Sequence, residues 1–84
     1  METGMSGNQQ KISLSDVAAG EAATVMDFLG GRLVNNRLAS LGFTPGVTIN
    51  MTQNFGRGPL IVLVRGTRVA LGRGEAAKII VARG

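Results

Sequence analysis

The sequence predicts a mostly β domain: a small, strongly bent β-barrel of about five strands, with one inserted helix and a short helical turn before the last strand. Three observations predict it. A single helical stripe lies near the front, the apolar period changes from helix to strand across residues 42–47, and turn residues recur through the second half. A chain of 84 residues forms one small domain, with a flexible tail expected over residues 1–11 and the fold over residues 12–84.

The helix is expected over residues 32–41. Val34, Leu38 and Leu41 fall at i, i+4 and i+7, which places them on one face of a helix with 3.6 residues per turn. Gly42 then supplies the left-handed residue that ends many helices, because glycine has no Cβ to clash in that conformation. The same segment therefore predicts both the core-facing side of the helix and its end.

The chain is expected to pass directly from this helix into a strand. Phe43 can fold back onto the last helical turn, as a Schellman-type cap requires. Pro45 presets φ for the second position of a type II turn, and Gly46 supplies the positive φ of the third. Apolar and polar residues then alternate, so a strand is expected over residues 47–55.

The remaining elements follow from apolar runs and turn residues. Leu14 and Val17 are spaced to anchor a short turn on the core, and Gly66 is expected in a tight turn. The unbroken apolar run at residues 60–64 predicts a strand buried on both faces. The other strands are expected at residues 22–29, 69–71 and 79–82, with a helical turn at residues 75–78.

The composition argues against catalysis and against metal binding. The chain has no histidine and no cysteine, which removes the usual general base, the thiolate nucleophile and the commonest metal ligands. Its five acidic residues are scattered, so paired carboxylates and a tight ferrous iron site are not expected. Met26 and Met51 are expected as core fillers. We therefore predict no enzymatic activity, no cofactor, no metal and no small-molecule substrate.

The charge balance favours an acidic partner. Nine Lys and Arg against five Asp and Glu give a net charge of +4. Nucleic acid is one such partner, and Arg57, Arg65, Arg68 and Arg73 come from turns expected at one end of the barrel. Only three aromatic residues are available for base stacking. The glycines around Arg57 and Arg73 match no phosphate-binding loop, and hairpin turns explain them better.

The order and spacing of these residues resemble the FeoA family over residues 12–83. The resemblance implies an SH3-like fold, a small β-barrel with an inserted helix, in a cytosolic protein of bacterial ferrous iron uptake. Residues 48–53, which carry no charge, and Gly74 depart from the family pattern. The matching positions are Leu14, Ser15, Asp16, Val17, Gly20, Leu38, Leu41, Gly42, Phe43, Pro45, Gly46, Gly58, Pro59, Leu60, Ile61, Val62, Gly66, Ala70, Leu71, Ala76, Ile79 and Val81.

The resemblance also implies a partner, FeoB, the membrane iron transporter with a cytosolic GTP-binding domain. We expect an accessory subunit in the cytoplasm that reaches the inner face of the membrane through FeoB and modulates its activity. A small nucleic-acid-binding barrel is the alternative, and pairing through the edge of residues 47–55 would allow a homo-oligomer. The candidate contacts, with core packing as the favoured alternative for the three apolar ones, are Arg37, Leu38, Leu41, Phe43, Arg57, Arg65, Arg68 and Arg73.

Overall fold

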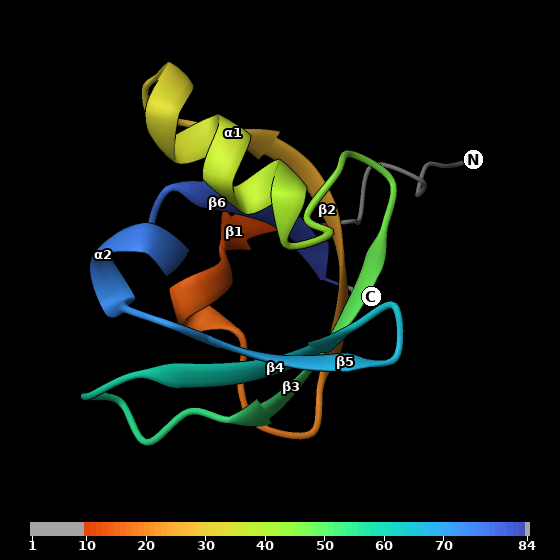
Figure 1. Cartoon of the computed structure of the whole chain (residues 1–84). Coiled ribbons are helices and arrows are strands. Elements are labelled where there is room, and N and C mark those ends of the chain that lie inside the picture. Colours follow the sequence, from red (N-terminus) through yellow and green to blue (C-terminus); the bar gives the residue numbers. More distant parts are fainter. Residues whose placement is uncertain (1–9, 84) are drawn as a thin grey trace.

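A computed structural model describes residues 10–83, which form one antiparallel sheet with two short helices and a 3₁₀ turn. The strand order is β1-β6-β2-β3-β4-β5. Figure 1 shows the sheet bending around a central core, with α1 lying across one side of it. The elements are β1 (Lys11–Ser13), η2 (Leu14–Asp16), β2 (Ala22–Phe28), α1 (Arg32–Ser40), β3 (Thr48–Gln53), β4 (Leu60–Val64), β5 (Thr67–Leu71), α2 (Arg73–Ala76) and β6 (Ile79–Arg83).

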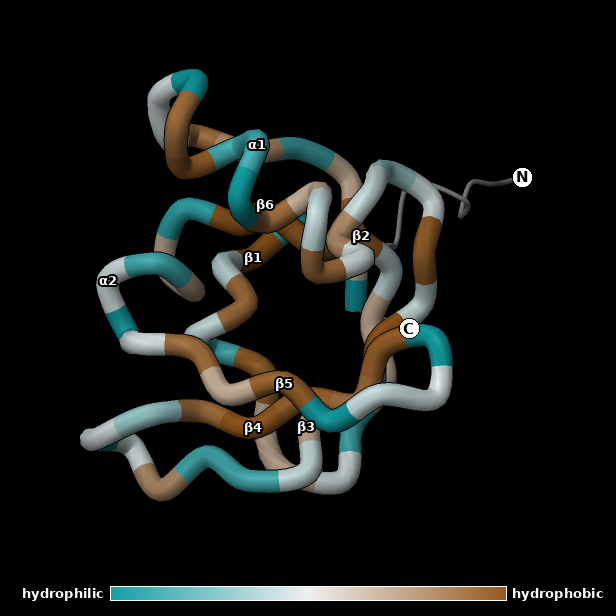
Figure 2. The backbone as a smooth tube through the Cα atoms, viewed as in Figure 1, coloured by the Kyte–Doolittle hydropathy of each residue, from teal (hydrophilic) through white to brown (hydrophobic). Residues whose placement is uncertain are grey.

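The core is built from alternate residues of the strands together with one side of α1. Figure 2 shows hydrophobic residues concentrated along β4 and β6 and hydrophilic ones at the turns. Among the described residues no polar or charged side chain is fully buried. The buried cluster consists of Leu14, Val17, Ala23, Val25, Leu38, Phe43, Ile49, Met51, Leu60, Val62, Val64, Val69, Leu71, Ala76, Ile79 and Val81.

The end of α1 is a Schellman cap, as the sequence predicts. Gly42 has a φ of +104°, and its N–H donates to the Ala39 carbonyl at 3.0 Å. The Phe43 N–H donates to the Leu38 carbonyl, also at 3.0 Å. These two bonds satisfy carbonyls that a helix end leaves unpaired. The Phe43 ring is fully buried, so the cap also delivers the largest buried side chain to the core.

The following turn joins α1 to the sheet. Gly46 has a φ of +93°, and the Val47 N–H donates to the Thr44 carbonyl at 3.0 Å, as in a type II turn. The Gly46 N–H donates to the Val25 carbonyl at 2.7 Å, and the Val25 N–H donates to the Val47 carbonyl at 2.9 Å. The turn therefore bonds to β2 and leads into the β2–β3 ladder, which starts at Thr48.

A second contact holds this junction from the other side of the barrel. Arg65 and Gly66 form a two-residue hairpin between β4 and β5, with φ of +52° and +78°, the pattern of a type I′ turn. The Arg65 side chain donates to the Gly42 carbonyl (3.4 Å, from Nε) and to Thr44 Oγ1 (3.1 Å, from Nη2). A cation beside the negative end of a helix dipole is stabilising. We call this contact the Arg65 clamp.

The structure differs from the sequence prediction in several places. Met26, expected in the core, is 40% exposed, and β3, expected at an edge, lies between β2 and β4 and is not free to pair with a second copy. β1 is a sixth strand, and it brings Lys11, assigned to the tail, into the sheet opposite Ala82. Three residues are too few to show a strand period, so the pattern did not reveal it. β4 is buried on one face and half-buried on the other, because antiparallel strands form its sheet. β5 begins at Thr67, and α2 begins two residues earlier than expected. The rest of the predicted tail, residues 1–9, lies outside the described residues.

We predict that Gly42→Ala lowers the free energy of unfolding by about 1–2 kcal/mol, because an L-residue at this φ is strained. A Cβ at this position would also lie 3.4 Å from the Arg65 Cδ. Gly74→Ala is the matched control: it lies in α2 with a helical φ and open space, so it should raise the free energy by about 0.5 kcal/mol. Urea unfolding measures both. Equal effects of the two substitutions would contradict the left-handed cap.

Candidate functional site

The four arginines expected at one end of the barrel lie at two ends. Arg57 precedes β4 and Arg73 follows β5, and the start of β4 pairs with the end of β5, so these two share one end of the hairpin. Arg65 lies in the turn at the opposite end, with Arg68 beside it in β5 (Figure 1). The five residues of β4 separate the two ends by about 15 Å. The expectation of one basic end is therefore wrong.

Three of the predicted contact residues are used inside the molecule. Arg37 of α1 forms an ion pair with Glu75 of α2. Arg65 forms the clamp on the α1 cap. Arg73 donates two hydrogen bonds to the Asn54 Oδ1. Within residues 10–83, Arg57 and Arg68 are exposed and have no ion pair or side-chain hydrogen bond, so these two cations remain available to a partner.

The apolar candidates lie beneath the helix rather than on its surface. Leu38 and Phe43 are fully buried, and Leu41 is half-buried against the same cluster. Val34 completes the stripe as a half-buried residue. This stripe packs α1 onto the core. A partner that contacts α1 would therefore contact the residues on the solvent-facing side of the helix.

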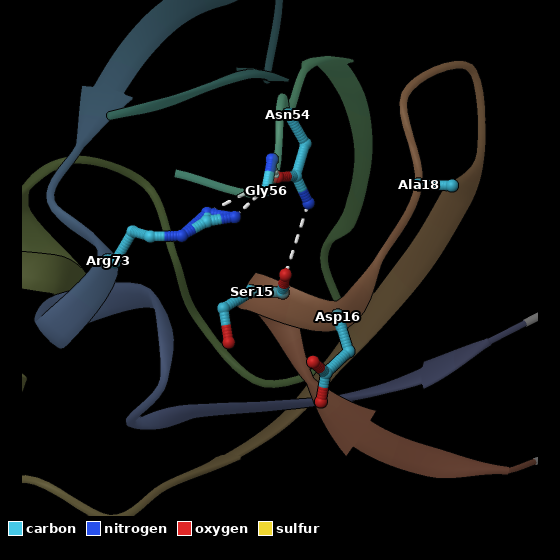
Figure 3. Close-up of a pocket in the computed structure, with 6 residues that line it drawn as sticks. All are labelled: Ser15, Asp16, Ala18, Asn54, Gly56 and Arg73. Atoms are coloured by element: carbon cyan, nitrogen blue, oxygen red, sulfur yellow. Dashed lines mark hydrogen bonds between the residues drawn. The ribbon is translucent and has the colours of Figure 1, made fainter. Parts of the chain in front are cut away.

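A polar hollow lies between η2, the β3–β4 loop and α2 (Figure 3), lined by Ser15, Asp16, Ala18, Asn54, Gly56 and Arg73. The Asn54 Nδ2 donates to the carbonyls of Ser15 and Val17, at 3.1 and 2.8 Å. Its Oδ1 accepts from Arg73 and from the Gly56 N–H, at 3.0 Å from the latter. These bonds use the amide and direct the guanidinium of Arg73 toward it. The hollow is best explained as the joint of three segments.

The start of α1 carries the most exposed apolar side chains near any helix. Leu29 is 66% exposed and Leu33 is 85% exposed, and Arg32 lies between them in the sequence. We call these three residues the α1 tip. The Leu29 N–H donates to the Lys78 carbonyl at 2.7 Å, so the tip is held at its base. Figure 1 shows this end of α1 extending beyond the sheet.

Sequence reasoning did not select the α1 tip. The sequence predicts Leu29 at the end of the preceding strand, where an apolar residue is common. Leu33 lies outside the i, i+4, i+7 stripe of Val34, Leu38 and Leu41, and that offset was the one signal of its exposure. Exposed apolar residues that form one continuous patch mark surfaces that bind another macromolecule, and arginine is enriched at such interfaces.

In the part of the chain that the structure covers, no three Asp or Glu side chains are grouped so that they could hold a metal ion. None of the described helices has the length and apolar character needed to span a membrane. The Arg37–Glu75 ion pair joins α1 to α2, and the Arg73–Asn54 hydrogen bonds join α2 to the β3–β4 loop.

Several known proteins are similar to this chain, although no protein of curated function matches it significantly. Residues 12–83 match the profile of the FeoA domain. A crystal structure of an iron uptake regulatory protein, FeoA, is 35% identical, has a TM-score of 0.85, and aligns over 89% of this chain and 100% of its own. Zinc-bound FeoA of Stenotrophomonas maltophilia, called a prokaryotic SH3 domain protein, is 32% identical, with a TM-score of 0.74 over 83% of this chain and 88% of its own.

A more distant likeness concerns the fold alone. A manganese-dependent transcriptional repressor is 20% identical, with a TM-score of 0.80, and the match covers 92% of this chain but 44% of the repressor. The predicted FeoA resemblance is confirmed by the domain profile and by the two solved FeoA proteins at 35% and 32% identity. The chain has an SH3-like fold and belongs to the FeoA family.

Proposed function

We propose that this chain is a non-enzymatic accessory subunit of a bacterial ferrous iron transport system, acting in the cytoplasm at the inner face of the membrane. It would bind a FeoB-type transporter and modulate its activity. Family membership supports the transport role, and the Stenotrophomonas maltophilia relative is named as a candidate activating factor of ferrous iron transport. The absence of histidine and cysteine from the sequence supports a non-enzymatic role, because these residues are the usual general base and thiolate nucleophile.

The observation that carries the proposal is the exposure of Leu29 and Leu33 at the α1 tip. Fully burying one leucine side chain contributes about 1.5–3 kcal/mol of stabilising free energy. Leu29 and Leu33 are mostly exposed, so the folded chain gains little of this free energy at either position. A partner surface that covers the tip would recover that free energy, and Arg32 adds a cation suited to carbonyl or carboxylate groups. The tip therefore suits contact with a protein better than contact with a small solute.

Such a subunit would act through the two nucleotide states of the transporter. Binding shifts an equilibrium between two conformations only by the difference in affinity for them. If the α1 tip binds the GTP-bound cytosolic domain more tightly than the GDP-bound one, the subunit stabilises the GTP state. If it binds the GDP-bound domain more tightly, the subunit stabilises the GDP state. The direction of regulation thus depends on one measurable ratio of affinities.

A nucleic-acid-binding barrel remains the alternative, and one feature of the β3–β4 loop favours it. Phe55 is 77% exposed and lies two residues from the exposed Arg57, a pairing suited to stacking on a base and contacting a phosphate. The basic residues are split between two ends of the barrel, which limits the phosphates that one surface can contact. For this reason we prefer the transporter.

We predict that isotope-labelled chain titrated with the cytosolic GTP-binding domain shows saturable amide shifts centred on the α1 tip. Leu29→Gln with Leu33→Gln should weaken this binding by about tenfold or more, because it removes most of the apolar contact. Phe55→Gln is the control, since it removes a similarly exposed apolar side chain from the β3–β4 loop and should leave the affinity unchanged. Figure 1 shows that loop on the opposite side of the molecule from α1. No binding to this domain or to the intact transporter would refute the proposed function.

The alternative makes a separate prediction for a single-stranded oligonucleotide. If the loop binds nucleic acid, affinity should fall steeply with salt, and Phe55→Ala with Arg57→Ala should abolish it. A fluorescence anisotropy titration at two salt concentrations measures this. Our proposal expects weak binding at low salt that these substitutions barely change, and a large loss on substitution would favour the nucleic-acid function instead.

A further inference from the structure

β5 is an edge of the sheet, and its turn determines which of its backbone groups face outward. It pairs with β4 through five consecutive residue pairs, from Val64 with Thr67 to Leu60 with Leu71. In a two-residue hairpin the pair that closes the turn exchanges both hydrogen bonds, and bonded and non-bonded pairs then alternate. Arg68 and Ala70 therefore occupy the non-bonded positions, so their N–H and C=O groups point away from β4.

Nothing in the described part of the chain covers these groups. No backbone or side-chain group of residues 10–83 bonds to Arg68 or Ala70 outside the β4 ladder, and both residues are exposed. Two donors and two acceptors thus form an open row along β5. Such a row is a template for another strand.

The usual protections of an edge strand are scarce here. β5 contains no proline, and its register with β4 is continuous, without a bulge. The opposite edge is better protected, because β1 is only three residues long. The single charged residue of β5 is Arg68, which blocks self-association but attracts an anion. This edge is therefore open to a particular kind of strand.

The charge around β5 selects an acidic strand. Residues 28–74 contain no Asp or Glu, and every charged residue among them is an arginine. Arg68 is free of intramolecular ion pairs in the described structure, and Arg65 lies in the adjoining turn. A second copy of the chain, added antiparallel at this edge, would bring two sets of these arginines together, so like charges oppose a homodimer here.

We propose that the β5 edge binds an extended acidic segment of a partner protein as a seventh, antiparallel strand. The outward groups of Arg68 and Ala70 would exchange main-chain hydrogen bonds with it, as in β-augmentation. A carboxylate opposite Arg68 would pair with its guanidinium. Two residues along, a Val or Ile opposite Ala70 would pack against the exposed methyl group of Ala70, on the face of the sheet that also carries the half-buried Ile61. The recognised pattern is thus a β-branched residue followed two positions later by an acidic residue, both on the same face of the added strand.

This inference does not rest on the proposed function. It concerns main-chain bonds at β5, whereas the transporter contact concerns the side chains of the α1 tip. A peptide that carries the acidic pattern tests the β5 edge without any transporter present. Failure of one experiment therefore leaves the other unaffected.

The test uses the full labelled chain and a short capped peptide with the sequence Val-Thr-Glu at its centre, which places valine opposite Ala70 and glutamate opposite Arg68 in an antiparallel strand. Binding should slow amide hydrogen exchange at Arg68 and Ala70 by about tenfold or more, with little change at the bonded Val69. A peptide with lysine in place of glutamate should bind about tenfold more weakly. A peptide N-methylated at alternate residues, which cannot complete the main-chain bonds, should not bind.

Ala70→Pro provides the sharpest variant. It removes an outward N–H and no ladder bond, and edge strands tolerate proline, so the fold should persist while peptide affinity falls about tenfold or more. Ala70→Val keeps the N–H and is the control expected to bind normally. If Ala70→Pro does not fold, Arg68→Glu serves instead and should reverse the preference between the glutamate and lysine peptides.

Three results would overturn the inference. The first is that the amide shifts that the peptide causes in the chain map away from β5. The second is that a folded Ala70→Pro variant binds the peptide as well as the parent chain does. The third is that the amides of Arg68 and Ala70 become protected from hydrogen exchange when the concentration of the chain is raised in the absence of peptide. That last result would assign the edge to a second copy.

Discussion

The arrangement of this barrel depends on a single left-handed residue, Gly42, and on the Arg65 clamp that holds its carbonyl. Gly42 ends α1 and sends Phe43 into the core. The type II turn then bonds to β2, so one short segment fixes the position of α1 and the start of β3. Arg65 reaches the same segment from the β4–β5 hairpin and thereby connects the helix to the far edge of the sheet. A side chain at Gly42 would strain the cap, because φ at this position is +104°, and its Cβ would lie in van der Waals contact with the Arg65 side chain.

The scarcity of acidic residues explains how the arginines are used. Because residues 28–74 lack carboxylates, Arg65 and Arg73 are satisfied by a carbonyl, a hydroxyl and an amide rather than by ion pairs. Arg37 finds its carboxylate only in Glu75, just beyond this stretch. Neutral acceptors leave the positive charge uncompensated, so the surface of this half of the chain stays basic although several of its arginines have structural partners.

The elements that sequence predicts well are those whose residue types admit one backbone conformation. Gly42, Pro45 and Gly46 fix a cap and a turn locally, and the alternation after them fixes which side of β3 is buried. β1 and the position of Arg57 and Arg73 relative to Arg65 depend on strand pairing between distant residues, which a local pattern does not encode. The same holds for Leu33, whose exposure is decided by where α1 sits on the sheet.

The α1 tip and the β5 edge differ in what they offer a partner, and the fold explains the difference. α1 satisfies its own backbone, so its tip can contribute only side chains, and leucine supplies apolar area. β5 satisfies half of its backbone through β4, so it offers main-chain groups, and its side chains serve to select among extended segments. The clamp connects the turn before β5 to the residue that ends α1. The two surfaces thus differ in chemistry and are held by different contacts: Leu29 at the α1 tip bonds to Lys78, whereas Arg65 joins the turn before β5 to the C-terminal end of α1.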